Sequence, residues 1–146
     1  QKADWNRVSE IYQQALLAGK STFNTVCPDY DEWDNNHIKD CRYVAEIDDM
    51  VVGWIAISPT SSRKAYKGVV EVSIYIDNKY QGSGIGTKLL KKYAMKAKNE
   101  DIGVCMWQFF PLTDPVSNFI KNVDFEKLDI GNESQRIDLE NGKTPY

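Results

Sequence analysis

The chain has 146 residues, of which 42% are hydrophobic and 27% charged, and it carries a formal net charge of -3. This length favours a single domain over residues 1–146, and the mildly acidic balance excludes the basic stripe typical of nucleic-acid-binding proteins. Three cysteines without close spacing and a single histidine, His37, argue against a disulfide framework and against a metal site. Free cysteines, the lack of a membrane-length apolar run and the lack of a signal peptide predict a cytoplasmic protein without a membrane partner. Because the chain begins at Gln1 and not at methionine, a processed or trimmed start stays open.

Two helices are predicted before the first strand. Trp5 to Ala18 repeats apolar residues at helical spacing and is followed by Gly19, a typical helix stop. Ser21 to Asp29 is irregular. Asp29 to His37 is predicted as a short helix, because the acidic residues in its first turn suit the helix dipole.

A β-hairpin and a long strand follow. Arg42 to Ile47 and Val51 to Ile57 predict the two hairpin strands, joined by a turn at Asp48-Asp49. A polar loop from Ser58 to Gly68 then leads to a strand from Val69 to Ile76. Alternation along this strand predicts one apolar core face and a second face with a carboxylate, a hydroxyl and a phenol, from Glu71, Ser73 and Tyr75.

The second half alternates helices and strands. Its predicted elements are a helix over Thr87–Asn99, a strand over Val104–Phe109, a short helix over Val116–Asn122 and a strand over Phe125–Ile130. The polar segment Gly131–Tyr146 shows no obvious strand, and hardly any strand precedes Asp4. The element order predicts a mixed α/β domain (an α+β arrangement around a mixed sheet).

Three glycines at alternate positions separate the strand ending at Ile76 from the next helix, in the segment Gln81-Gly82-Ser83-Gly84-Ile85-Gly86. Glycines let the backbone approach an anion closely, and the first N–H groups of the helix point at it, so the segment predicts a phosphate-binding loop. A P-loop would need Gly-Lys followed by Ser or Thr, and a dinucleotide-binding fingerprint would need G-x-G-x-x-G. The segment has neither pattern.

Its Q-x-x-G-x-G spacing resembles the pyrophosphate-binding signature of GCN5-related N-acetyltransferases (GNAT). Further runs resemble the phosphinothricin N-acetyltransferase-like branch of that family. They are Val70–Ile76, Gly53–Pro59, Ser61–Arg63 with Tyr66, and, upstream, Ile11-Tyr12 and Ser21–Thr25. The similarity covers roughly residues 4 to 130. It implies a GNAT-type fold and an acetyl-CoA-dependent enzyme that acetylates small amines bearing a carboxylate, such as phosphinothricin, methionine sulfoximine or methionine sulfone.

Glu71 is the candidate general base. Free amines mostly carry a proton at neutral pH, so a base within reach of the amine or of a water helps transfer. Glu71 interrupts an apolar strand, where a carboxylate costs free energy unless it is used or paired. The resemblance gives the glutamate at this position the same role. The alternative is a structural salt bridge to Arg63 or to a lysine.

The resemblance also implies the remaining site. The backbone around Ile74, Tyr75 and Ile76 would pair with the pantetheine arm of acetyl-CoA, Gln81 to Gly86 would hold its pyrophosphate, and Thr113 would contact the coenzyme. Phe23, Arg63, Lys64 and Tyr66 would bind the amine substrate, with Arg63 as the guanidinium partner of its carboxylate. The resemblance also implies that Trp54 and Tyr75 contact the substrate, but a tryptophan in a hairpin usually packs in the core.

Four positions differ from the family pattern, one of them Asp124, which replaces a glycine that normally ends a helix. The other three bear on function. Thr113 stands where asparagine is common, Val116 near the place of a serine, and Ile120 replaces a histidine. These changes keep open an alternative function, an acyl-CoA-binding domain that has lost efficient transfer and serves sensing or assembly. The short ends predict exposed sheet edges, which either partner chains or a longer natural chain would cover. The family resemblance also implies a homodimer.

Overall fold

A computed structural model describes residues 1–19, 25–59, 70–99, 105–106 and 136–139. The helical elements are the single turns η1 (Lys2–Asp4), η2 (Lys39–Cys41) and η4 (Asn78–Tyr80) and the α-helices α1 (Trp5–Ala18), α2 (Tyr30–Asn36) and α3 (Ile85–Asn99). The strands are β1 (Tyr43–Ile47), β2 (Met50–Pro59), β3 (Val70–Ile76), β4 (Cys105–Met106) and β5 (Arg136–Asp138).

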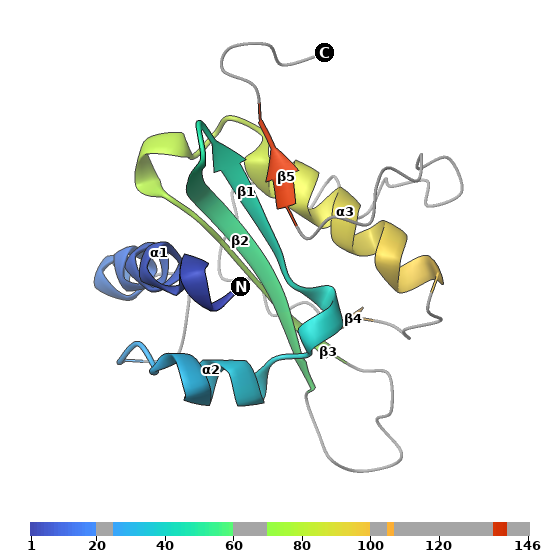
Figure 1. The fold of residues 1–146 in the computed structure, drawn as a ribbon, viewed down its shortest axis with the longest axis horizontal. Coiled ribbons are helices and arrows are strands. Elements are labelled where there is room, and N and C mark those ends of the chain that lie inside the picture. Colours follow the sequence, from blue (N-terminus) through green and yellow to red (C-terminus); the bar gives the residue numbers. More distant parts are fainter. Residues whose placement is uncertain (20–24, 60–69, 100–104, 107–135, 140–146) are drawn as a thin grey trace.

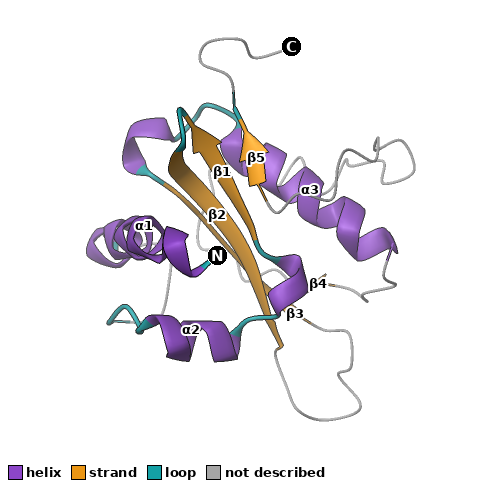
Figure 2. Cartoon of the chain, in the orientation of Figure 1, coloured by secondary structure: helices purple, strands orange, loops and turns teal. Residues whose placement is uncertain are grey.

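The strands form one five-stranded sheet in the order β4-β3-β2-β1-β5. The three central strands pair antiparallel, whereas β4 pairs parallel with β3 and β5 pairs parallel with β1. Helices α1 and α2 cover one side of this sheet and α3 covers the other (Figures 1 and 2). This arrangement confirms the predicted mixed α/β class. In the part of the chain that the structure describes, no helix is long and apolar enough to cross a bilayer.

Each sheet face has its own apolar core. Buried residues of α3 pack on one face against both hairpin strands and β3, through Ile85, Leu89, Leu90, Tyr93, Ala45, Ile55, Ile57 and Val72. The other face carries an aromatic core under α1 and α2, made by Val8, Ile11, Tyr12, Trp33, Val51, Trp54 and Ala56. Trp54 is 2% exposed and belongs to the core. Two helical layers on a central sheet therefore hold β3 between them.

The hairpin contains a turn and a bulge. Asp48 and Asp49 both have positive φ, of 50° and 60°, as a tight turn between twisted strands requires. The pairing then shifts, because Ala45 faces Gly53 while the next residue of β1 faces Val51. Val52 is left as the extra residue of a β-bulge. The backbone carbonyl of Val52 accepts a hydrogen bond from the backbone N–H that directly follows β3.

The structure corrects several boundaries and one absence. Helix α2 is one residue shorter at each end than predicted, and β1 begins one residue later than predicted. Helix α3 begins at Ile85, two residues before the predicted start, and β2 extends one residue earlier and two residues later than predicted. The segment predicted to lack a strand contains β5, which covers the outer edge of β1 (Figure 1). Three residues are too few to show strand periodicity in a sequence. The elements predicted over 116–122 and 125–130 lie outside the described residues, as does most of the strand predicted over 104–109.

Candidate active site

The glycine segment connects β3 to α3 through two residues in the left-handed region. Gly82 has φ +78° and Gly84 has φ +80°, values that an L side chain adopts only with strain. A Cβ at either position would meet no atom within 4 Å, so the backbone conformation and not crowding requires glycine. None of the described residues fills the space beside either glycine, so a ligand can approach the backbone there.

The backbone N–H groups of this segment have no acceptor within the described part of the chain. The first bond of α3 runs from Lys88 N to the Gly84 carbonyl, at 3.1 Å. No acceptor among the described residues receives the backbone N–H groups of residues 82–87. A helix start that leaves such donors free attracts an anion through its hydrogen bonds and its dipole. The predicted phosphate loop therefore has the backbone that this role needs.

Two side chains brace the loop from within. Gln81 Nε2 donates to Asn78 Oδ1 at 3.1 Å and to the Ile76 carbonyl at 3.4 Å. Ser83 Oγ donates to the Tyr80 carbonyl. Both side chains thus bond back to the turn that precedes the glycines.

Glu71 lies on the α1/α2 side of β3, the same side as Ser73 and Tyr75. In the sheet it is opposite Ser58 of β2 and beside Met106 of β4. Its side chain is half-buried, and it has no hydrogen bond or ion pair with another described residue. Arg63, the partner that a structural role would give it, is not among the described residues.

At the end of β3 the side chains pack into the two cores, and the backbone pairs with β2 along one edge. Ile74 and Ile76 pack into the α3 core, while the Tyr75 ring lies 5.1 Å from that of Tyr12 and 4.9 Å from that of Trp54. On one edge β3 pairs with β2 as far as Ile76. On the other edge the described pairing with β4 ends at Glu71, and residues 107–135 fall outside the description.

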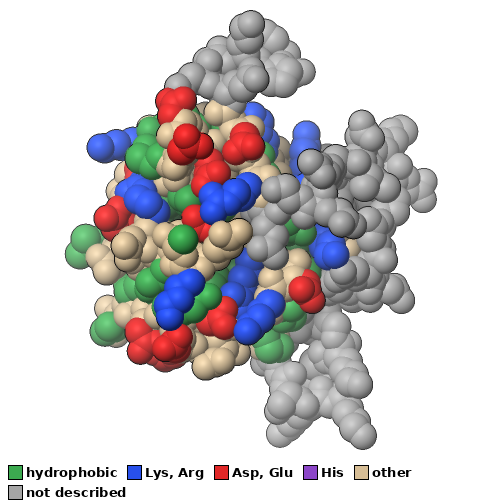
Figure 3. All heavy atoms as spheres, viewed as in Figure 1, with side chains coloured by type: hydrophobic (Ala, Val, Ile, Leu, Met, Phe, Trp, Pro, Cys, Tyr) green, Lys and Arg blue, Asp and Glu red, His purple; other side chains and the backbone are tan. Residues whose placement is uncertain are grey.

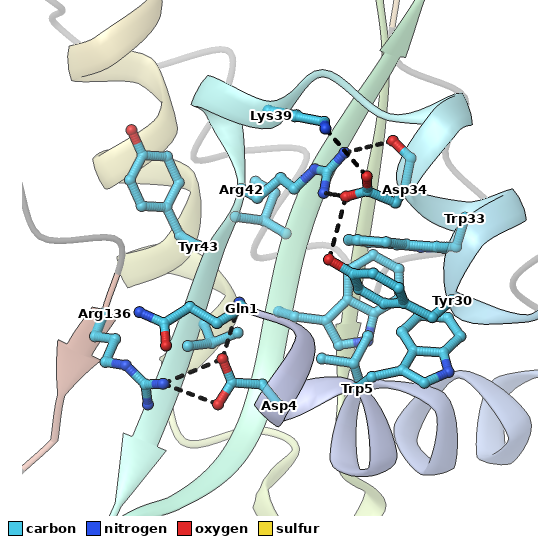
Figure 4. A pocket seen from close by; sticks show the side chains of 14 residues that line it. Gln1, Asp4, Trp5, Tyr30, Trp33, Asp34, Lys39, Arg42, Tyr43 and Arg136 are labelled. Carbon is cyan, nitrogen blue, oxygen red and sulfur yellow. Dashed lines mark hydrogen bonds and ion pairs between the residues drawn. The ribbon is translucent and has the colours of Figure 1, made fainter.

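A second polar region lies at the other end of the α1/α2 face, as a pocket of about 290 Å³. Aromatic rings of Trp5, Tyr30 and Trp33 gather on one side of it (Figure 4). Charged side chains line the rest, and all of them pair with each other: Asp4 with Arg136 and the N-terminus, and Asp34 with Arg42 and Lys39. Of the described residues considered for the active site, Trp54 alone lines this pocket, and it is a buried core residue.

These charges neutralise each other locally. The guanidinium of Arg42, which donates to Asp34 at 2.5 Å, lowers the pKa of that carboxyl against the effect of its desolvation. Arg42 also donates to the carbonyls of His37 and Asp34 and lies 4.7 Å above the Trp33 ring. The pocket therefore lies where α2, η2 and β1 meet, and its ion pairs hold these elements together.

Comparison with known proteins identifies the family. The model of the acetyltransferase (GNAT) family matches residues 5–125. YwnH of Bacillus subtilis (strain 168), provisionally named as a phosphinothricin acetyltransferase, is 34% identical over 117 residues, which are 77% of this chain and 72% of YwnH. The L-amino acid N-acyltransferase MnaT of Escherichia coli (strain K12) is 29% identical over 107 residues, 67% of this chain and 60% of MnaT.

The fold agrees with this assignment. The structure of YncA from Salmonella typhimurium, solved with its cofactor acetyl-CoA, superposes with a TM-score of 0.65 at 26% identity, over 73% of this chain and 65% of YncA. The chain belongs to the GNAT family of acetyltransferases. Its enzyme class is accordingly an acetyl-CoA-dependent N-acetyltransferase.

The residues matched by the GNAT model include every predicted site residue, but the structure does not describe all of them. The four predicted substrate contacts and one coenzyme contact lie outside the described residues: Phe23, Arg63, Lys64, Tyr66 and Thr113. Acidic and basic side chains intermingle on the described part of the face seen in Figure 3. Among the residues described, no three His, Cys, Asp or Glu side chains gather as a metal site would require.

One residue beside the GNAT glycine segment was missed at the sequence level. Asp77, between β3 and η4, is only 4% exposed and forms hydrogen bonds to β2, to η4 and to α1. Its position immediately before the glycine motif was the available signal. Its partners Arg7 and Gln14 lie 70 and 63 residues earlier, and no sequence pattern reveals such a contact.

Proposed function

We propose that this chain transfers the acetyl group of acetyl-CoA to the primary amine of a small amino acid or analogue that bears a carboxylate, by direct transfer in a ternary complex. The observation that carries the proposal is the run of backbone N–H groups at the glycine segment, for which the described residues supply no acceptor and which suit a pyrophosphate. Glu71 supplies the second element of the site, a half-buried carboxylate on the neighbouring strand with no described partner.

In this proposal the amine nitrogen attacks the thioester carbonyl carbon, the C–S bond breaks, and coenzyme A leaves as its thiolate. Glu71 takes the proton that the amine nitrogen loses, directly or through one water. A thiol with a pKa of about 8.5 leaves as thiolate without a strong acid, so no further proton donor is assigned. A backbone N–H near Tyr75 would polarise the thioester carbonyl, as oxyanion donors do.

The coenzyme would extend along the end of β3 and across the glycine segment. The backbone of Ile74, Tyr75 and Ile76 pairs with the pantetheine arm in this proposal, and residues 81–86 receive the pyrophosphate. Gly82 and Gly84 matter because a side chain at either would strain the loop and fill the open space above it. YncA, a structural neighbour at 26% identity, was solved with acetyl-CoA, which supports this choice of ligand.

The acceptor class is proposed from the relatives and from the sequence. MnaT is named as an L-amino acid N-acyltransferase and YwnH, provisionally, as a phosphinothricin acetyltransferase. Arg63 would bind the substrate carboxylate bidentately, and Phe23, Lys64 and Tyr66 would line the remainder of the acceptor site. We also propose that the chain is a single domain and forms a homodimer in the cytoplasm. Size-exclusion chromatography with light scattering would test the oligomeric state.

A panel assay tests the function. The purified chain is incubated with acetyl-CoA and with phosphinothricin, methionine sulfoximine, methionine sulfone and the common amino acids, and released thiol is measured. Turnover of a carboxylate-bearing amine, lost in the decarboxylated analogue of the same amine, supports the proposal. Acetyl-CoA binding without turnover of any amine would instead favour an acyl-CoA-binding domain. The changes at Thr113, Val116 and Ile120 leave that alternative open.

A further inference from the structure

Asp77 occupies the junction between the two halves of the proposed coenzyme site. It directly follows Ile76, the last residue of β3, and it begins the turn that leads into the glycine segment. Its backbone N–H donates to the Val52 carbonyl and its carbonyl accepts from Tyr80 N, both at 2.9 Å. Its carboxylate Oδ1 accepts from Lys79 N at 2.9 Å. This one residue therefore fixes where η4 leaves the sheet.

The second carboxylate oxygen of Asp77 is held by α1. Arg7 Nη2 donates to Asp77 Oδ2 at 2.8 Å, and Gln14 Nε2 donates to the same oxygen at 3.3 Å. Arg7 and Gln14 are two helical turns apart and so lie on one face of α1. The Asp77 side chain is 6% exposed and that of Arg7 is 29% exposed, so water screens this pair only partly.

The same two α1 side chains also bond to backbone groups of β2 and η4, the elements that Asp77 joins. Arg7 Nε donates to the Val51 carbonyl beside the β2 bulge at 3.2 Å, and Gln14 Oε1 accepts from Asn78 N at 2.9 Å. Desolvation of the Asp77 carboxyl raises its pKa, but the bonds from Lys79 N, Arg7 and Gln14 outweigh this effect and lower the pKa below its usual value. The carboxylate is therefore ionised and fully engaged at neutral pH.

We propose that Asp77, Arg7 and Gln14 form a positioning cluster that sets the glycine segment at the correct place for the coenzyme pyrophosphate, so that α1 tunes coenzyme affinity without touching the coenzyme. This inference rests on the proposed function, since it presumes that the glycine segment binds the pyrophosphate. None of the three side chains is assigned a contact with substrate. A shift of this loop relative to β3 would separate the site for the pantetheine arm from the site for the pyrophosphate.

The test uses Asp77→Asn, Gln14→Ala and Arg7→Lys in the full chain. Asp77→Asn keeps the acceptor for Lys79 N but removes the charge that holds Arg7, and Arg7→Lys keeps the charge but loses the bond to Val51. Calorimetric titration with acetyl-CoA is expected to show a Kd raised about tenfold in Asp77→Asn and about threefold in Gln14→Ala and Arg7→Lys, within the range of couplings through packed networks. The double variant Gln14→Ala/Asp77→Asn should lose less than the product of the single effects, because the two share one contact.

Two controls separate positioning from general destabilisation. Glu10→Gln removes the exposed partner of Arg7, at 2.5 Å, and Asp34→Asn removes a carboxylate from the ion pairs of the pocket. Both are expected to leave the acetyl-CoA Kd within twofold of the original. With an amine that is turned over, kcat/KM for acetyl-pantetheine, which lacks the pyrophosphate, should stay within twofold in all three cluster variants. A merely structural role would lower kcat/KM for both thioesters alike.

Each outcome can be assigned. If the unaltered chain fails to bind acetyl-CoA, the proposed function is wrong and the cluster has nothing to position. If the unaltered chain binds while the folded Asp77→Asn, Gln14→Ala and Arg7→Lys variants bind equally tightly, the positioning role alone is wrong. If Asp77→Asn does not fold, Gln14→Ala and Arg7→Lys carry the test, because each removes side-chain bonds at the surface of α1 and keeps the carboxylate.

Discussion

The molecule has two polar regions that differ in what remains unpartnered. The pocket beside α2 is hollow, aromatic and highly charged, yet its arginines and carboxylates already pair with one another. The glycine segment is exposed and carries few charges, yet its N–H groups at residues 82–87 have no acceptor among the described residues. Binding a ligand at the pocket would cost existing ion pairs, whereas binding an anion at the segment would satisfy free donors.

This difference shows why a cavity is a poor guide to an anion-binding site that is formed by backbone N–H groups. A pyrophosphate is large, charged and bound by N–H groups at the surface, so its site need not be a cavity before the ligand arrives. Charge at the pocket, by contrast, stabilises the position of α2. Activity and coenzyme affinity are therefore expected to depend on the glycine segment and nearby Glu71, and stability on the pocket.

The largest expected effect is on turnover, from Glu71→Gln. Removing the proposed base should lower kcat by about a hundredfold or more, since general-base catalysis contributes about 10²–10⁴. The Kd for acetyl-CoA should stay within twofold, because Glu71 is not assigned to the coenzyme. Asp34→Asn, a matched carboxylate change in the pocket, should leave kcat unchanged. A kcat within threefold of the original in Glu71→Gln would remove Glu71 from the mechanism.

The next effect is on coenzyme affinity, from Gly84→Ala. A β-carbon at φ +80° strains the loop by about 1–2 kcal/mol, and relief of that strain would move the N–H donors, so the acetyl-CoA Kd should rise about tenfold. Gly19→Ala is the matched control, since Gly19 also has positive φ, of 64°, and also has open space around it. It should lower the melting temperature similarly and leave the Kd unchanged. Equal Kd changes in both variants would contradict the assignment.

Local patterns predicted the α-helices α1 to α3 and the strands β1 to β3. Helix α1 has the predicted bounds because its apolar spacing and its terminal Gly19 act over a few residues. The start of α3 was wrong by two residues, since Gly86 adopts the helical first turn and not the loop. Strand β5 was missed because only the position of β1, far away in the sequence, creates an edge for it to pair with.

The candidate site also contains features that the sequence predicted and contacts that it could not predict. The glycine segment and Glu71 were visible as spacing and alternation, and the structure gives the segment its free N–H groups. The cluster at Asp77 was invisible, because a hydrogen bond that joins α1 to η4 depends on packing across the sheet and not on local pattern. The pairing of Arg42 with Asp34 was equally unpredictable, although both residues lie within predicted elements.

A change in the pocket should affect stability and not function. Arg42→Gln removes an ion pair and three bonds to backbone carbonyls from a side chain that is 16% exposed. The melting temperature should fall by about 5 °C or more, as expected for losing several bonds in a domain of this size. Calorimetry on the folded variant should give an unchanged acetyl-CoA Kd. A tenfold weaker Kd with little change in melting temperature would make the pocket part of the site.

The smallest effect is a dependence of stability on pH through His37. The ring of His37 stacks on Trp33 with centroids 4.5 Å apart. Burial, and then the positive charge of nearby Arg42, lower the pKa of this imidazole by more than the Trp33 carbonyl and Asp34 raise it. The unfolded chain therefore takes up a proton below about pH 6.5 before the folded chain does, and stability falls as pH drops from there. The slope cannot exceed about 1.4 kcal/mol per pH unit for one group. Urea unfolding of His37→Gln should lack this fall between pH 7 and pH 5.5, since the chain has one histidine.

The central claim is that the N–H groups of the glycine segment receive the coenzyme pyrophosphate. Titration of acetyl-CoA into the ¹⁵N-labelled chain tests it most directly, over the range of about 1 μM to 1 mM in which enzymes commonly bind substrates. The account predicts saturable binding, with the largest downfield proton shifts at the amides of residues 82–87 and small shifts around the pocket. Binding that shifts the pocket residues while the amides of 82–87 stay unchanged would contradict it, as would no binding by the folded chain at about 1 mM.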